Sequence, residues 1–101
     1  MALVTAPDAA CAEKLARALV DERLAACVNV LPQVRSFYRW EGRVQDDPEV
    51  LLVIKTRAAR SGALAARVRE LHPYALPEVL ELPAVGGSDA YLEWVRTETS
   101  E

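Results

Sequence analysis

The chain has 101 residues, enough for one domain spanning residues 1–101. It is 51% hydrophobic and 27% charged, which excludes a disordered chain. Its apolar runs reach only about five residues, whereas about 20 are needed to span a bilayer. The net charge of −3 provides no basic surplus to neutralise phosphates, so we expect no nucleic-acid partner. Because the apolar runs are short, we also expect no membrane partner.

The N-terminal part of the chain predicts a strand followed by a helix. Residues 2–5 form a short apolar run that stops before Pro7. Asp8 suits a helix N-cap, because its carboxylate can accept from the unpaired N–H groups of the first turn. Apolar residues then recur with a period close to 3.6, which predicts a helix over about residues 8–25.

A long hairpin is predicted next. Residues 26–31 are apolar, and Pro32 interrupts them, which indicates a bulge or an edge position. Side chains alternate beyond the proline up to a turn at Gly42. Residues 44–56 form the return strand, and we expect the acidic stretch at residues 46–48 to distort it.

The last part of the chain predicts a helix, a strand and a second helix. The helix covers about residues 58–71 and ends at Pro73, residues 77–82 form a short strand, and Ser88 is the N-cap of a C-terminal helix. The order β-α-β-β-α-β-α is that of the ferredoxin-like α+β fold, in which two helices pack on one face of an antiparallel sheet.

The return strand carries more apolar surface than one layer of helices can cover. A half-exposed strand should alternate apolar and polar residues, but residues 50–54 are all apolar. A domain of this size has little chain to spare for a second layer. We therefore expect a cyclic homo-oligomer to cover the second face. The alternative is a monomer in which the C-terminal helix closes the sheet.

Three side chains are candidates for metal or thiol chemistry. His72, the only histidine, and Cys27, in an apolar strand, offer ligands for copper and other borderline or soft metals. The structural alternatives are that His72 caps its helix and that Cys27 is a small buried hydrophobe. Cys11 lies in the first turn of a helix, where the helix N-terminus could lower the pKa of its thiol, or it is a spectator.

Acidic and aromatic residues of the hairpin offer two further candidate sites. Asp46, Asp47 and Glu49 could bind a hard divalent cation, or they are ordinary loop residues. Tyr38 and Trp40 share one strand face and indicate either a subunit contact or a platform for a small molecule. No nucleophile, base and acid can be assembled, and no phosphate loop is present, so we expect no enzymatic activity.

The cellular compartment is also constrained by the sequence. The first residues carry neither a basic segment nor a hydrophobic stretch of signal-peptide length. Two cysteines are too few for a disulfide framework. We expect a cytoplasmic protein with reduced thiols.

Six segments between residues 5 and 94 resemble one known family. They are Thr5-Ala6-Pro7-Asp8; Leu24-Ala25-Ala26-Cys27-Val28-Asn29; Ser36-Phe37-Tyr38-Arg39-Trp40-Glu41-Gly42; Glu49 with Leu51, Leu52, Ile54, Lys55 and Thr56; His72-Pro73-Tyr74 with Pro77-Glu78; and Tyr91-Leu92-Glu93-Trp94. In this order they resemble CutA, the divalent-cation-tolerance family.

The resemblance implies a fold, an assembly and a role. It implies a ferredoxin-like fold, a homotrimer intertwined through hairpin-mediated sheet pairing, and a link to copper and other divalent cations. The trimer is similar in architecture to nitrogen-regulatory signalling trimers, which bind effectors between subunits. Some members carry a cysteine at the position of Val4 and a second histidine at that of Leu71, so this chain keeps only His72 of that set.

Three functional hypotheses follow. The first is a non-enzymatic homotrimer that binds divalent cations such as copper(II), with His72 and Cys27 as ligands. The second is a signalling-type trimer whose intersubunit cleft holds a small anionic or aromatic ligand. That cleft would be lined by Tyr38, Trp40, Lys55, Tyr74 and Glu78. A third possibility is a structural trimer that anchors another protein.

Overall fold

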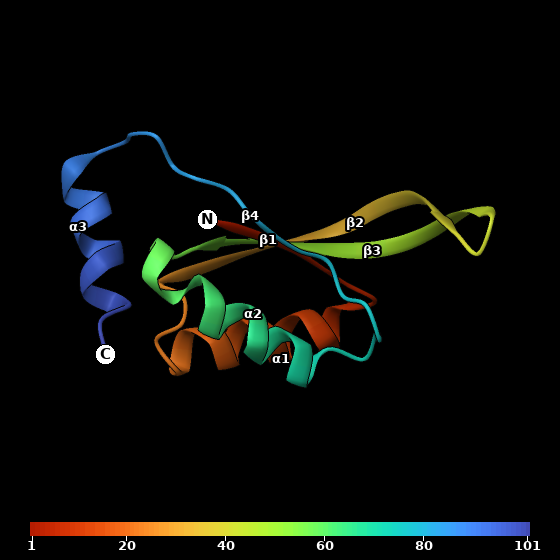
Figure 1. The fold of residues 1–101 in the computed structure, drawn as a ribbon, viewed down its shortest axis with the longest axis horizontal. Coiled ribbons are helices and arrows are strands. Elements are labelled where there is room, and N and C mark those ends of the chain that lie inside the picture. Colours follow the sequence, from red (N-terminus) through yellow and green to blue (C-terminus); the bar gives the residue numbers. More distant parts are fainter.

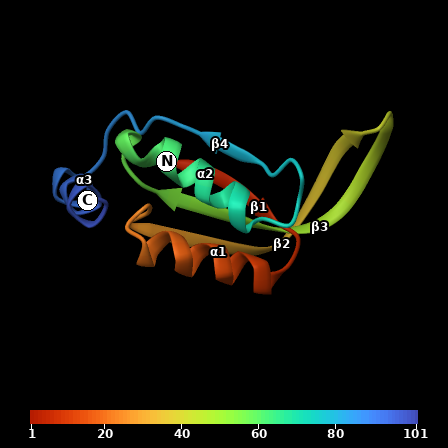
Figure 2. The ribbon, with the colours of Figure 1, turned by 60° about the horizontal axis from the view of Figure 1, so that its bottom comes forward.

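The computed structural model describes residues 1–101 and has the predicted order of elements. The elements are β1 (Ala2–Ala6), α1 (Ala9–Asp21), β2 (Cys27–Trp40), β3 (Arg43–Lys55), a 3₁₀ turn (Ala58–Arg60) leading into α2 (Ser61–Leu71), β4 (Val79–Glu81) and α3 (Asp89–Glu98). The strands form one antiparallel sheet in the order β2-β3-β1-β4. Helices α1 and α2 lie on one face of it (Figure 1, Figure 2). The ferredoxin-like α+β prediction is confirmed.

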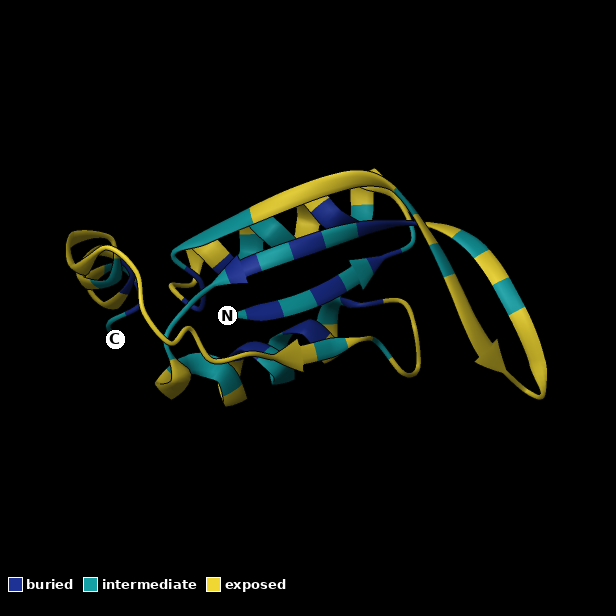
Figure 3. Ribbon diagram, turned by 90° about the horizontal axis from the view of Figure 1, so that it is seen from above, coloured by how far each residue is buried: buried dark blue, intermediate teal, exposed yellow.

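The core lies between these two helices and the sheet face toward them. Residues of β1 and of the inner half of β3 alternate between buried and half-buried, which Figure 3 shows as dark and paler bands. The largest fully buried apolar side chains are Leu15, Leu19, Leu52, Ile54, Leu64, Val4 and Val68. Burying each such side chain contributes about 1.5–3 kcal/mol, so this layer is the main stabilising contact within one chain. None of the helices has the length and hydropathy of a membrane span.

Helix α1 begins where the sequence predicts and ends earlier. The Asp8 carboxylate accepts a hydrogen bond from the backbone N–H of Cys11 at 2.8 Å, which confirms the N-cap. The predicted end at residue 25 is wrong: the helix stops at Asp21, because Arg23 adopts a left-handed φ of 60°. Leu24 is still buried after this turn, which explains why its position fits the helical pattern.

The hairpin of β2 and β3 contains the predicted bulge and turn. The pairing shifts between Leu31 and Val34, which confirms an irregularity at Pro32. Glu41 and Gly42 at the tip have φ values of 52° and 77°. Positive φ at both central residues is the requirement of the type I′ hairpin turn, whose backbone twist matches that of the flanking strands.

The outer half of the hairpin, residues 34–40 of β2 and 43–49 of β3, is regular and projects past the helices (Figure 2). Its pairing runs without a shift from Val34 to Trp40 on β2, so the distortion predicted at residues 46–48 is wrong. Strand β1 pairs only with residues 50–54 of β3, which leaves β3 with a free edge at Pro48. A proline, which has no N–H to donate, is tolerated at such an edge.

The second face of the sheet is open in a single chain. Five apolar side chains from the four strands share this face and are half-buried or exposed: Leu3, Leu31, Leu51, Val53 and Leu80. Helix α3 lies beyond the end of the sheet and not over this face (Figure 1, Figure 3). The alternative in which the C-terminal helix closes the sheet therefore does not hold in this structure.

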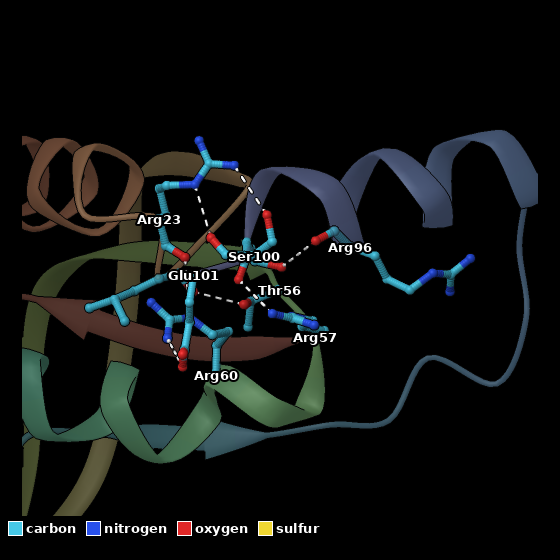
Figure 4. A network of polar contacts seen from close by, with 9 residues as sticks. Arg23, Thr56, Arg57, Arg60, Arg96, Ser100 and Glu101 are labelled. Carbon is cyan, nitrogen blue, oxygen red and sulfur yellow. Dashed lines mark hydrogen bonds and ion pairs between the residues drawn. The ribbon is translucent and has the colours of Figure 1, made fainter.

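Helix α3 starts at the predicted N-cap and is held at its C-terminal end by arginines. The Ser88 hydroxyl accepts from the backbone N–H of Tyr91 at 3.4 Å. At the other end Arg23 donates to the carbonyl of Ser100 at 3.0 Å, and Arg57 donates to that of Thr99 at 3.0 Å (Figure 4). Carbonyls at a helix C-terminus lack partners within the helix, so these side chains stabilise its end.

Candidate functional site

His72 links the end of α2 to β1. Its ring Nε2 donates to the carbonyl of Thr5 at 2.7 Å, and its Nδ1 accepts from the backbone N–H of Tyr74 at 3.1 Å. The residue is 6% exposed and occupies the C-cap position of α2. Both ring nitrogens are therefore engaged in the neutral, Nε2-protonated form, and neither has a lone pair free for a metal in this conformation.

Cys27 lies far from this histidine. It is half-buried at the start of β2, opposite Lys55, and its Sγ is 4.0 Å from Oδ1 of Asn29. Thr5, which bonds the His72 ring, pairs with Leu51. The two pairs are offset by four residue steps along β3, or roughly 13 Å at the usual rise of a strand.

The two predicted ligands therefore do not meet within one chain. No group of three or more His, Cys, Asp or Glu side chains that could hold a metal ion is assembled anywhere in the chain. A closed metal site needs about four ligands, so the donors of a single chain do not fit a tightly bound metal.

Burial, with the nearby charge of Asp8, raises the pKa of the Cys11 thiol, the opposite of the lowering considered for a helix N-terminus.

The acidic residues of the hairpin are divided among different partners. Asp46 accepts from Arg35 through both carboxylate oxygens, at 2.9 and 2.7 Å. Asp47 accepts from the hydroxyl of Tyr38 at 2.5 Å, and this bond raises the pKa of Tyr38 to about 12. Successive strand residues point to opposite faces, which is why neighbouring carboxylates do not converge on one cation.

A cavity of about 660 Å³ lies between the hairpin and the loop that follows α2. Its lining residues are Thr5, Ser36, Phe37, Tyr38, Trp40, Glu49, Tyr74, Ala75, Leu76, Pro77 and Glu78. The alternation of β2 puts Ser36, Tyr38 and Trp40 on one face, while the bond from His72 to the backbone of Tyr74 holds the start of the loop. This volume is within the range usual for small-molecule sites.

The cavity is acidic. Glu49 is 8% exposed, and its Oε2 accepts one hydrogen bond, from the hydroxyl of Tyr74 at 3.4 Å. Burial raises the pKa of Glu78, and the charge of Glu49 raises it further. Burial also raises the pKa of Tyr74, again with Glu49 as the next cause. No lysine or arginine lines the cavity.

The structure brings together four of the five residues predicted for the cleft. Tyr38, Trp40, Tyr74 and Glu78 line the cavity, whereas Lys55 does not, because it pairs with Cys27 at the other end of β3. The predicted cleft does not include Glu49, which the sequence presents only as one of three neighbouring hairpin carboxylates, but Glu49 lines the cavity. Sequence reasoning also missed Thr5 and the loop residues 75–77. Only the closely spaced prolines at 73 and 77 hint that this loop is held in place.

A comparison with protein families settles the family. The family model described as CutA1 divalent ion tolerance protein matches residues 1–98. The chain belongs to the CutA1 divalent ion tolerance family. This confirms the resemblance stated from the six sequence segments.

Individual relatives agree with this assignment. The divalent-cation tolerance protein CutA of Thermus thermophilus is 47% identical over 97 residues, covering 96% of this chain and 94% of that protein. The chloroplastic protein CutA of Arabidopsis thaliana is 50% identical over 96 residues, which are 95% of this chain but only 53% of the relative. The chain thus spans about half the length of some curated relatives.

Solved structures of the family have the same fold. The divalent cation tolerance protein from Thermus thermophilus superposes with a TM-score of 0.96 at 46% identity, over 98% of this chain and 96% of that chain. CutA1 from Oryza sativa gives a TM-score of 0.96 at 46% identity, over 99% and 92%. CutA1 structures therefore share the backbone arrangement of this chain, including the long hairpin and the position of α3 beyond the sheet.

Proposed function

We propose that this chain works as a non-enzymatic homotrimer in divalent-cation tolerance. Family membership supports the role, and the open apolar face of the sheet is the observation that carries the assembly. Leu31 and Leu80 on this face are 42% and 57% exposed, and identical neighbours would remove them from water. The projecting outer hairpin has a free edge along β3, which offers a neighbour a strand to pair with.

Sedimentation of the purified protein tests the assembly. We expect a particle of three chains at micromolar protein and no dependence on added metal. A folded particle of 11.1 kDa under these conditions would overturn the trimer. We also propose a reducing compartment such as the cytoplasm, in keeping with two free thiols.

Metal binding in this proposal is weak and uses donors from more than one chain. The support is that one chain assembles no metal cluster and that Val4 and Leu71 provide no ligand at the positions where some members have them. Calorimetric titration of the assembled protein with copper(II), beside His72→Ala and Cys27→Ser, tests it. Binding lost in either variant would assign that residue as a ligand, whereas no binding by the wild type would refute the proposal.

A second candidate function is the binding of a small effector in the cavity between the hairpin and the loop. The observation that favours it is that the cavity is already built in one chain and lined by aromatic and acidic side chains. A thermal-shift screen of the assembled protein against metabolites of either charge tests this function. Unchanged melting for every compound would refute it.

A further inference from the structure

The lining of the cavity has an unusual combination of side chains. Three aromatic side chains, those of Tyr38, Trp40 and Tyr74, lie at the cavity and remain 41–49% exposed, whereas the Phe37 ring is on the opposite face of β2, against the guanidinium of Arg35. Exposed aromatic rings at a hollow surface favour ligands with an apolar body. The negative faces of such rings also attract a cationic group.

The buried carboxylate of Glu49 adds a directional acceptor. Its Oε2 receives the long bond from Tyr74, while Oε1 has no hydrogen-bond partner. In the whole chain, Nε of Arg57 is the only side-chain polar atom that is both sealed from solvent and without a hydrogen-bond partner. Since Oε1 of Glu49 also has no partner, it is not sealed from solvent and still faces open space. Since Glu49 lines the cavity and is 8% exposed, that open space is the cavity.

The charges of the cavity are uncompensated. Glu49 and Glu78 both line it and repel one another, and no basic side chain is present to balance them. Lys55, the cation expected in the predicted cleft, is at the other end of β3. An anionic ligand would add a third negative charge to the cavity. Coulomb repulsion therefore disfavours the small anionic ligand that the second functional hypothesis considered.

We propose that this cavity binds an organic ammonium ion, with its N–H groups donating to Glu49 and its alkyl part against the aromatic side chains. The proposal rests on the second candidate function and names its ligand class. A primary ammonium has three donors, enough for Oε1 of Glu49 and for Glu78. A hydrated inorganic cation would use the carboxylates alone and would leave the aromatic lining without a role.

The fluorescence of Trp40 reports on the cavity directly. Trp94→Phe leaves Trp40 as the single tryptophan of each chain in the assembled protein. At constant ionic strength the protein is titrated with n-butylammonium, n-butanol and n-butyrate, which share an alkyl chain and differ in charge. We expect saturable binding of n-butylammonium and at least tenfold weaker binding of the other two.

Matched charge variants locate the site. Glu49→Gln should weaken n-butylammonium roughly tenfold or more, because a charge-assisted hydrogen bond is lost. Glu81→Gln removes the same charge from β4 outside the cavity and should change the affinity less than about twofold. Equal effects of the two variants would overturn the proposal.

The outcomes separate this proposal from the function on which it rests. If n-butyrate or n-butanol binds as well as n-butylammonium, the ammonium proposal fails and the cavity remains a ligand site. If magnesium chloride displaces n-butylammonium at equal concentration, the site is one for inorganic cations and the proposal fails. If none of the three compounds binds and no metabolite shifts melting, the cavity function itself fails.

Discussion

Replacing His72 by alanine separates a structural role from metal ligation. The ring makes two hydrogen bonds inside the protein, to the carbonyl of Thr5 and from the N–H of Tyr74. A buried group left without its partner costs about 1–3 kcal/mol, so the loss of both should lower the free energy of unfolding by about 2–6 kcal/mol. This loss should be present in full without any metal.

Urea unfolding in the presence of a chelator measures the effect. Wild type and His72→Ala are compared at equal protomer concentration, because the stability of an oligomer depends on it. His72→Gln is the matched control, since its side-chain amide can still donate to the carbonyl of Thr5, and it should recover part of the loss. A difference below about 0.5 kcal/mol, or one seen only with added copper(II), would refute the structural role.

Three other predictions concern the sheet face, the first helix and the hairpin. Leu51→Glu puts a charge on the open sheet face and should convert the proposed trimer to a folded monomer in sedimentation; an unchanged mass would place the interface elsewhere. Asp8→Ala removes the N-cap of α1 and should lower the free energy of unfolding by about 1 kcal/mol in urea unfolding, and no change would show that the cap contributes nothing. Asp47→Asn removes the negative acceptor that raises the pKa of Tyr38 to about 12, so one tyrosine should ionise at lower pH in a spectrophotometric titration, toward the ordinary value of about 10; an identical titration curve would contradict this cause.

Local sequence signals predicted much of the fold because their physics is local. Asp8 caps a helix through a hydrogen bond three residues away, and Gly42 allows the turn at the hairpin tip. Pro32 marks the bulge because it has no N–H for the sheet. The family itself was also readable from short segments in their order along the chain.

Local signals failed where a distant contact decided the backbone. Helix α1 stops at Asp21, although Leu24 continues its apolar pattern, because a left-handed Arg23 turns the chain and its side chain bonds the end of α3. The acidic stretch at residues 46–48 was expected to distort a strand, but Asp46 and Asp47 find partners on β2.

By itself the sequence determined the order of elements, the surplus of apolar residues on β3 and the family, since periodicity, caps and turn residues act within a few positions. Only the tertiary structure decided the site. Strand register placed Lys55 and Cys27 at one end of the sheet, and packing of the loop after α2 brought Glu78 beside Glu49 and the aromatic side chains of the hairpin. The hydrogen bonds of His72 were decided in the same way, because its partner Thr5 is 67 residues away in the chain and adjacent only after folding.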